Sequence, residues 1–225
     1  GQALRRVEDQ RLLTGGGHYM ADFNFERQLH GFVLRSPHAH ARFSFGDLSA
    51  VRAMKGVRLV LTAADLGHLG PVPCLAPLPN DDGSQNLVAM APVLADGVAR
   101  HVGDAVAFIV ADTIEQARDA SESVPITYAP QKAVVDMRHA TTKGAVAVWD
   151  KQPDNIAFDA SMGDKAKVDA AFAKAAHVVS LEIENNRLIT NYMETRGAIG
   201  AYDASSQSYT LHVSSQGVHC LLYTS

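Results

Sequence analysis

The apolar run at positions 105–111 constrains the fold of this chain more than any other stretch. Its length and its branched side chains are typical of a strand that is buried on both faces. Thr113 follows it, and Gln116 stands three positions later, which is the spacing of a helix capping box. The sequence therefore predicts a buried strand followed by a helix over residues 114–122, whose small alanines let it lie close on a sheet.

Residues 39–45 alternate with a period of two. Ala39, Ala41, Phe43 and Phe45 fall on one face, and the polar side chains of His38, His40, Arg42 and Ser44 fall on the other. Pro37 has no N–H for a ladder and favours extended geometry at the residue before it. This pattern predicts a half-buried strand that the chain enters from a bend.

Similar patterns predict the remaining elements. We expect strands at 29–35, 57–62, 124–128, 179–184, 197–202 and 209–213, and helices at 50–55 and from 164 onward. Gly56 is expected to close the first of these helices in left-handed geometry, and Pro125 favours an edge position for its strand. The part up to Tyr128 is expected to surround one sheet, with a long loop at 67–96.

Composition excludes several classes of protein. The chain has 225 residues, 47% of them hydrophobic, a formal charge of −4 and a pI near 6.2. These values favour a packed globular protein and argue against nucleic-acid binding. No apolar run is long enough to span a bilayer. The two cysteines, Cys74 and Cys220, lie far apart in the sequence, which favours a reducing, cytoplasmic location. We assign no metal-binding or catalytic role to either cysteine.

Two further patterns allow alternative interpretations. His38 and His40 would project from one strand face and so could hold a metal, but no acidic residue or cysteine lies nearby to complete the set, and Arg35 and Arg42 flank them. We favour hydrogen bonds across a domain boundary or to backbone, and we predict no metal ligands. Gly15–Gly17 suggest a phosphate cradle, but no strand and helix flank them, so a flexible bend is favoured.

Five motifs, taken together and in this order, resemble one known family. They are Arg6-Val7-Glu8-Asp9 with Leu13-Thr14-Gly15, Arg35-Ser36-Pro37-His38-Ala39-His40-Ala41, Val102-Gly103-Asp104-Ala105-Val106-Ala107, Met193-Glu194-Thr195-Arg196-Gly197, and Ser214-Ser215-Gln216-Gly217-Val218-His219. The chain is similar to the molybdopterin-binding large subunit of the xanthine dehydrogenase and aldehyde oxidase family. The similarity covers nearly the whole chain and is greatest to the bacterial branch related to aerobic carbon monoxide dehydrogenase.

The resemblance implies a mixed α/β (α+β) fold in two parts. An α/β hammerhead domain is expected at 16–128, a connection at 129–141, and the first part of a molybdopterin-binding domain at 142–219. Residues 220–225 leave the family pattern and resemble translated adapter DNA, so we expect a non-native tail there.

The resemblance assigns one cofactor contact, Gln216, whose neutral amide would hydrogen-bond to an oxo ligand of the molybdenum. The alternative is that Gln216 is a polar strand end. Glu194 and Arg196 would form an ion pair or shape the substrate channel, and the ion pair is favoured. No catalytic residue is assigned, because the family's glutamate base and its glycine-rich cofactor loop are expected beyond this chain.

The chemistry implied by the resemblance is oxidation of carbon monoxide, an aldehyde or an N-heterocycle, with water as the oxygen source. The cofactor would be molybdenum-molybdopterin in its cytosine dinucleotide form. Electrons would pass to [2Fe-2S] clusters on a small subunit and to FAD on a medium subunit, in a dimer of heterotrimers. The substrate, and whether copper takes part, stay open.

Two hypotheses of different classes follow. In the first, the chain is part of a molybdenum-dependent oxidoreductase and is inactive alone. In the second, it is a truncated, noncatalytic assembly or interaction module. Continuation of the reading frame into the glycine-rich loop and the late glutamate would favour the enzyme.

Overall fold

The structure, a computed structural model, describes residues 3–72, 79–84, 91–185, 188, 191–192 and 194–215. The chain divides into two compact units. Leu29–Val178 form one unit, and the described residues of Gly1–Gln28 and Val179–Ser225 form the other. No helix among the described residues is long and apolar enough to cross a membrane.

The larger unit holds most of the regular structure. Its elements are β1 (His30–Arg35), β2 (Ala41–Phe45), α2 (Ser49–Arg52), β3 (Val57–Leu61), a 3-10 helix (Ala63–Leu66), β4 (Val98–Ala99), β5 (Ala105–Ala111), α3 (Ile114–Glu122), β6 (Ile126–Pro130), a 3-10 helix (Met137–His139) and α4 (Lys165–Lys174). The smaller unit contains α1 (Asp9–Leu13), a 3-10 helix (Met20–Asp22), β7 (Ala198–Asp203) and β8 (Ser208–Val213). The fold is therefore mixed α/β, as predicted.

Strand β5 is the centre of the first sheet and confirms the prediction from the apolar run. It pairs antiparallel with β1 on one side and β3 on the other. Ile109, at its middle, faces Phe32 of β1 and Val60 of β3 and has no exposed surface. A strand flanked on both sides and covered by a helix is shielded from water, which is why its sequence is continuously apolar.

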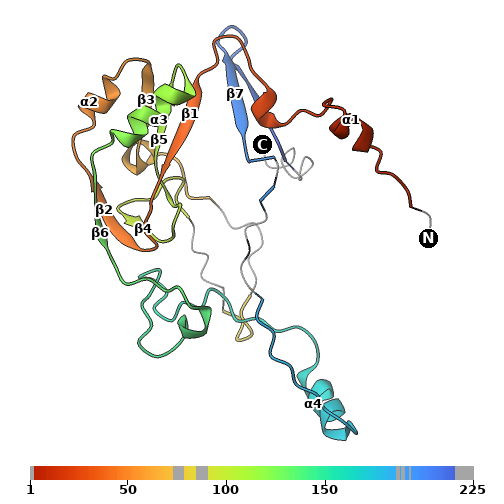
Figure 1. Ribbon diagram of the computed structural model, residues 1–225. Helices are drawn as coiled ribbons and strands as arrows, with labels where there is room; N and C mark the ends of the chain where they lie inside the picture. Colours follow the sequence, from red (N-terminus) through yellow and green to blue (C-terminus); the bar gives the residue numbers. More distant parts are fainter. Residues whose placement is uncertain are drawn as a thin grey trace. The chain divides into compact units, whose positions relative to one another are not determined.

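Helix α3 lies on this sheet and has the predicted bounds (Figure 1). The predicted capping box is present: Thr113 Oγ1 accepts the N–H of Gln116 at 3.3 Å, and Gln116 Oε1 accepts the N–H of Thr113 at 3.2 Å. Ala117 and Ala120 are fully buried in the same core cluster as Ile109. Their small side chains allow the helix backbone to approach the sheet closely.

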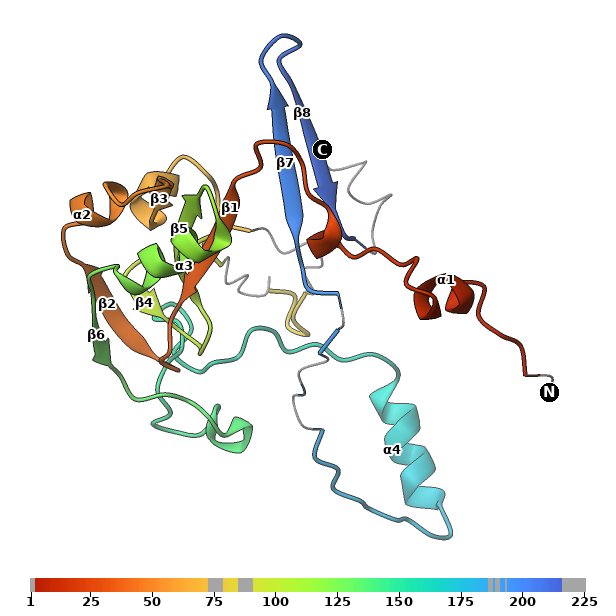
Figure 2. The same cartoon turned by 45° about the horizontal axis from the view of Figure 1, so that its top comes forward.

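A second sheet, in the order β4-β2-β6, shows that the prediction of one sheet was wrong (Figure 2). The chain bends after β1 at Pro37, and β2 begins at Ala41 rather than at Ala39. Because of this bend, β2 pairs with β4 and β6 and not with β1. Strand β6 lies at the edge, as Pro125 predicts. Phe43 forms a second core cluster with three small residues, Ala95, Ala99 and Val106.

Gly56 has φ of +83°, which confirms the predicted left-handed position, although α2 ends earlier than expected, at Arg52. A Cβ at Gly56 would also meet the side-chain amide of Gln116, the residue that caps α3. We therefore expect Gly56→Ala to lower the free energy of unfolding by about 1–2 kcal/mol, through left-handed strain and a displaced cap. Urea denaturation followed by circular dichroism measures this.

The matched control is Gly70→Ala. Gly70 lies outside the left-handed region, and no heavy atom stands within 4 Å of its added Cβ. We expect a change of less than about 0.5 kcal/mol there. Equal effects of the two substitutions would contradict the proposed cause.

The smaller unit confirms the predicted hairpin, with β7 and β8 paired from Ala198 opposite Val213 to Asp203 opposite Ser208 (Figure 2). The predicted strand at 179–184 was wrong: this segment belongs to no sheet. Its apolar side chains, including Leu181 and Ile183, are exposed. An alternating sequence forms a strand only where another strand completes its hydrogen bonds, and no described segment pairs with this one.

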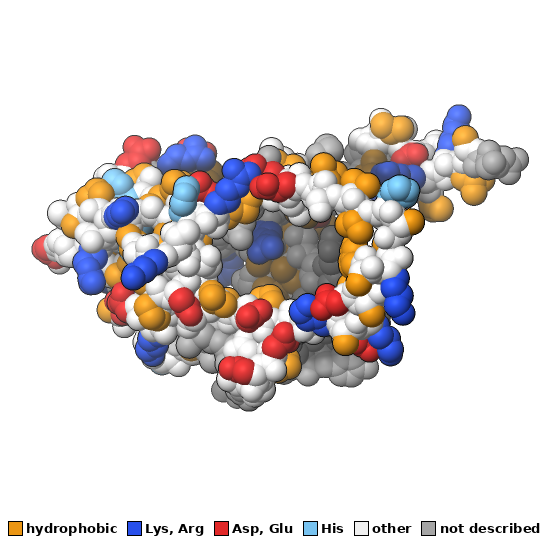
Figure 3. Space-filling model, turned by 90° about the horizontal axis from the view of Figure 1, so that it is seen from below, with side chains coloured by type: hydrophobic (Ala, Val, Ile, Leu, Met, Phe, Trp, Pro, Cys, Tyr) orange, Lys and Arg blue, Asp and Glu red, His pale blue; other side chains and the backbone are white. Residues whose placement is uncertain are grey.

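Charged side chains are mixed rather than segregated. On the face that Figure 3 shows, Lys and Arg side chains stand among Asp and Glu side chains, with apolar side chains between them. No single large basic area is visible on that face.

Candidate functional site

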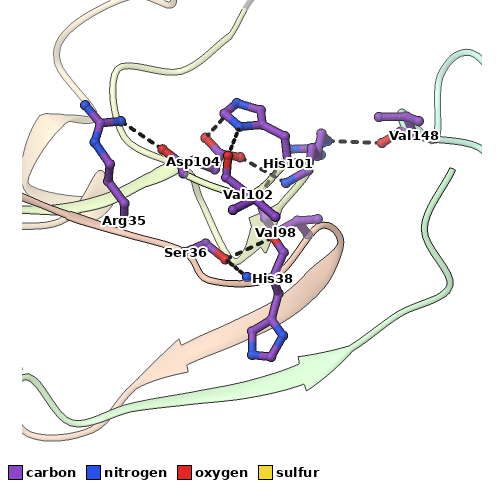
Figure 4. Close-up of polar contacts among 10 residues, drawn as sticks. Arg35, Ser36, His38, Val98, His101, Val102, Asp104 and Val148 are labelled. Carbon is purple, nitrogen blue, oxygen red and sulfur yellow. Dashed lines mark hydrogen bonds and ion pairs between the residues drawn. The ribbon is translucent and has the colours of Figure 1, made fainter. Parts of the chain in front are cut away.

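Two of the family-like motifs, around Arg35 and Asp104, meet at one end of the β1–β5 pair (Figure 4). The ladder is irregular there: Leu34 faces Ala107, but Arg35 faces Ala105, so β5 has an extra residue at Val106. Such bulges redirect the strand and are common beside functional sites.

Reciprocal hydrogen bonds join the two motifs. The Ser36 N–H donates to Asp104 O, and the Gly103 N–H donates to Ser36 O, both at 2.8 Å. Arg35 Nη1 also donates to Gly103 O at 2.8 Å. Residues distant in sequence are therefore fastened together chiefly by backbone groups, which explains why small or turn-forming residues stand at these positions.

Ser36 is 1% exposed, and its hydroxyl is satisfied within its own turn. Ser36 Oγ accepts the N–H of His38 at 3.1 Å and donates to His38 O at 3.3 Å. A buried hydroxyl without partners would be costly, so this local pair allows the turn to be buried.

The Asp104 carboxylate holds the turn that leads into β5. Its Oδ2 accepts the N–H of Arg100 at 2.9 Å, and its Oδ1 lies 3.7 Å from His101 Nε2. His101 Nδ1 contacts Val102 O at 3.0 Å. These groups are engaged in fixing the loop, and the junction presents no nucleophile with an adjacent base.

Of the two histidines after Pro37, His40 has the kind of contact that we favoured. His40 Nδ1 lies 2.9 Å from the backbone oxygen of Lys132, which confirms a hydrogen bond to backbone. The His38 ring instead contacts the ring of Tyr128 in a tilted arrangement, with ring centroids 4.8 Å apart. Burial raises the pKa of the Tyr128 hydroxyl above its ordinary value. No group of three or more potential metal ligands occurs within the ranges that the structure describes.

The glycines near the N-terminus close helix α1. Gly15 has φ of +78°, and the N–H of Gly16 donates to Arg11 O at 2.8 Å. The expected bend is present, and its role is that of a helix C-terminus.

Within the smaller unit, the motif at 194–197 contacts the segment around Met20. Glu194 Oε1 accepts the N–H of Met20 at 3.2 Å. A Cβ on Gly197 would stand 2.9 Å from Met20 Cγ, so only glycine fits at this position without displacing Met20. Phe25 stacks on His212 of β8, with centroids 4.8 Å apart.

The expected ion pair between Glu194 and Arg196 was wrong: no such pair joins these two described residues. The first N–H groups of a helical turn lack a partner within the helix, and the N–H of Met20 is one of them. The Glu194 carboxylate satisfies that donor instead.

The hairpin turn contains the most strongly shifted acid. Hydrogen bonds from Ser205 and Ser206 lower the pKa of the Asp203 carboxyl to about 2. Because the folded pKa lies below the ordinary value of about 3.9, the ionised turn is stabilised above that value and loses this stabilisation as pH falls through about 2. We expect an NMR titration of the carboxyl carbon to show this low midpoint, and Ser205→Ala to raise it. An unchanged midpoint in that variant would contradict the assignment.

Several predicted positions lie outside the described residues. They are Gln216, Cys74, Cys220 and the tail at 220–225. The structure places β8 and Ser214–Ser215 directly before Gln216, and the cofactor role of Gln216 stays a prediction.

Two open hollows are lined by described residues of the larger unit. One, of about 280 Å³, lies between the segments 132–136 and 142–146. The other, of about 350 Å³, lies beside β3 and includes Arg52 and Asp65. Arg52 and Asp65 lie 3.7 Å apart, and hydrogen bonds from Thr62 lower the pKa of Asp65.

Sequence reasoning missed two side chains that organise this region, Arg100 and Asn155. The Arg100 guanidinium lies 3.8 Å from the ring centroid of Trp149. Asn155 binds three backbone groups, of Ala140, Val146 and Val148. The one available signal was that Trp149 is the chain's single tryptophan, placed in an otherwise irregular stretch.

Comparison with known proteins defines the class. Residues 14–132 match the family model described as the a/b hammerhead domain of aldehyde oxidase and xanthine dehydrogenase, and residues 148–224 match the molybdopterin cofactor-binding domain. The chain thus contains a match to a hammerhead domain followed by a match to a molybdopterin cofactor-binding domain. The chain belongs to the aldehyde oxidase and xanthine dehydrogenase family.

Individual relatives agree. The nicotine 6-hydroxylase large subunit of Paenarthrobacter nicotinovorans is 38% identical over 97% of this chain and 26% of its own length. The carbon monoxide dehydrogenase large chain of Afipia carboxidovorans is 33% identical over 96% of this chain and 27% of its own. Quinoline 2-oxidoreductase from Pseudomonas putida 86 has a similar structure, with a TM-score of 0.76 at 32% identity over 96% of this chain and 27% of that one. The chain therefore spans about a quarter of the length of these relatives.

The described residues do not by themselves fit a molybdopterin group. Both hollows are lined by residues outside the 148–224 match, and Gln216 lies beyond the described chain.

Proposed function

We propose that this chain is the N-terminal part of the large subunit of a molybdenum hydroxylase that takes its oxygen from water. The observation that carries the proposal is the order of the two matches, hammerhead at 14–132 and cofactor-binding at 148–224. When bound, a molybdenum cofactor supplies two-electron oxidation chemistry. The described residues support it as a scaffold: the Arg35–Gly103 and Ser36–Asp104 bonds fix the sheet from which the chain continues.

The remaining parts of the enzyme are proposed from the family. Names of the relatives include "large subunit", "large chain" and "complex subunit gamma", which supports a multi-subunit enzyme. We assign FAD to a medium subunit and [2Fe-2S] clusters to a small subunit, in a dimer of heterotrimers, with the cofactor in its cytosine dinucleotide form and a cytoplasmic location. Domain limits of 16–128 and 142–219, joined by 129–141, complete the proposal.

For the substrate, N-heteroaromatic rings come first. Three relatives are named for nicotine, nicotinate and quinoline, each of which offers a carbon beside a ring nitrogen. Carbon monoxide is the second candidate, because two relatives are carbon monoxide dehydrogenase large chains.

The test uses the complete parent protein with its partner subunits. Purified enzyme is expected to contain molybdenum near one per large subunit and to transfer ¹⁸O from labelled water into hydroxylated nicotine or quinoline. If ¹⁸O from water appears only in the product of carbon monoxide oxidation, and not in hydroxylated nicotine or quinoline, carbon monoxide is the substrate. A complete parent chain that purifies with its partners but without molybdenum would overturn the proposal and favour the noncatalytic module.

The 225-residue chain alone is expected to be inactive and to hold no molybdenum tightly, since it spans only about a quarter of the length of its relatives and most of the cofactor's enclosure is expected in the remainder. Metal analysis after gel filtration measures this. Stoichiometric molybdenum in the purified chain would contradict it.

A further inference from the structure

The region matched to the cofactor-binding domain begins at residue 148, and its first residues lie against the hammerhead region. Two separate sets of contacts join them, both inside the unit Leu29–Val178. One centres on Arg100 and Trp149, and the other on Asp81 and Ser161.

Arg100 makes the first set of contacts, and Figure 4 labels its two backbone acceptors, Val98 and Val148. Its guanidinium carbon lies 3.8 Å from the centroid of the Trp149 ring, a cation–π geometry. Its Nε donates to Val148 O at 3.2 Å, and its Nη1 donates to Val98 O at 3.4 Å. One side chain thus bridges the β4 strand and the start of the cofactor-binding region.

Arg100 is itself held by a family-like motif. Its N–H donates to Asp104 Oδ2 at 2.9 Å, and Asp104 O accepts the N–H of Ser36. The bonds between the two motifs therefore fix the backbone from which the guanidinium extends. The junction in Figure 4 therefore also positions Arg100, in addition to joining the two motifs.

The segment that Arg100 contacts is preorganised by Asn155. Asn155 Oδ1 accepts the N–H of Val148 at 2.8 Å. Its Nδ2 donates to Ala140 O at 2.8 Å and to Val146 O at 2.9 Å. Asn155 has φ of +59°, a conformation that asparagine tolerates better than most residues. Val148 and Trp149 are thus presented on a closed loop rather than on a free chain.

The second set of contacts joins the turn at 80–84 to residues 159–161. The Asp81 N–H donates to Asp159 O at 2.8 Å, and the Asp159 N–H donates to Asn80 Oδ1 at 2.9 Å. The Ser161 N–H donates to Asp81 Oδ1 at 2.7 Å. The hydrogen bonds from Ser161 lower the pKa of the Asp81 carboxyl below its ordinary value. Asp82 accepts the N–H of Ser84 in the same turn.

We propose that Arg100 and Asp81 are positioning residues that fasten residues 148–161 to the hammerhead region, so that the hammerhead fold fixes where the chain continues into the cofactor-binding domain. Loss of either side chain would leave both regions folded but release the fastened segment. The proposal rests on the proposed function only for the role of that domain in catalysis. The contacts themselves are tested without cofactor.

The test is amide hydrogen exchange on the 225-residue chain and on its Arg100→Ala and Asp81→Ala variants. A cation–π contact and a hydrogen bond together favour docking by roughly tenfold, so exchange over 148–161 is expected to rise by about that factor in Arg100→Ala. In Asp81→Ala the rise is expected at Ser161, whose N–H loses its carboxylate acceptor. Peptides covering β5 are expected to keep the exchange rate of the wild-type chain.

Fluorescence gives a second readout, because Trp149 is the only tryptophan. Acrylamide quenching of its emission is expected to rise about twofold in Arg100→Ala. Arg100→Lys keeps a cation near the ring but loses the planar group and the Nε donor. Its acrylamide quenching is expected to lie between those of the wild-type chain and Arg100→Ala. This partial rescue separates a role of the guanidinium from general loss of stability.

The matched control is Arg58→Ala. Arg58 makes a bidentate pair with Asp112 at 2.7 and 3.0 Å and is remote in sequence from the fastened segment. It is expected to leave exchange over 148–161 and the quenching of Trp149 unchanged. Wild-type exchange over 148–161 in both Arg100→Ala and Asp81→Ala, or an equal rise in Arg58→Ala, would overturn the proposal. If Arg100→Ala also speeds exchange in β5, exchange over 148–161 in Arg100→Lys and Asp81→Ala is used to test the proposal instead.

Discussion

Replacing Ile109 with alanine is expected to lower the free energy of unfolding by about 3–4 kcal/mol. Ile109 has no exposed surface and stands between Phe32 and Val60 on the two neighbouring strands. Helix α3 covers it with Ala117 and Ala120, which are too small to fill the space that a shortened side chain would leave. Both the lost burial and the remaining cavity therefore contribute to the cost.

Urea denaturation followed by circular dichroism measures this change. Leu59→Ala is the control, because Leu59 lies on the adjacent strand β3 but is 45% exposed. We expect a cost below about 1 kcal/mol there. If Ile109→Ala cost no more than Leu59→Ala, β5 would not be the centre of the core.

The largest effect on activity is expected from Gln216→Ala in the complete parent enzyme. Groups that contact the ligands of a metal change activity by about 10–100-fold when they are removed, and the resemblance assigns Gln216 to that role. We expect kcat/KM to fall within this range while the molybdenum content stays close to that of the wild-type enzyme. The measurement combines steady-state kinetics with metal analysis of the same preparation.

Thr210→Ala serves as the control, since Thr210 is an exposed residue of the neighbouring strand β8. It is expected to leave kcat/KM unchanged. Wild-type kcat/KM in Gln216→Ala would assign Gln216 to the alternative role of a polar strand end.

Local elements could be predicted from the sequence, because their signals are local. The apolar run predicted β5, the Thr113–Gln116 spacing predicted the start of α3, and a polar turn between two strand-like runs predicted the β7–β8 hairpin. In each case the residues that form the element also satisfy its hydrogen bonds or bury its surface. Neighbouring sequence therefore contains the information.

Elements that depend on distant partners were predicted less well. Residues 179–184 have strand periodicity but no partner strand among the described residues, and α2 is shorter than its pattern suggested. The division into two sheets depends on the bend at Pro37 and on which strands β2 meets. Pairings across tens of residues leave no mark in the local pattern.

In the candidate site too, local motifs could be recognised from the sequence, but contacts between distant residues could not. The family resemblance singled out the motifs around Arg35 and Asp104, but it did not show that their backbones bond to each other. It also gave no sign that Arg100 reaches Trp149, or that Glu194 binds the backbone of Met20. Such contacts depend on the tertiary fold and needed the structure.

The strand pairings also determine the order in which this chain can fold during synthesis. Strand β1 cannot complete its pairing until β5 has been synthesised as far as Ala111. Ala41 of β2 cannot pair until Pro130 of β6 has been synthesised. At about 5–20 residues per second, the early strands stay unpaired for several seconds after they leave the ribosome. Phe32, Phe43 and Phe45 are exposed during that interval, so residues 32–45 would offer an early binding site to a chaperone that binds short apolar segments.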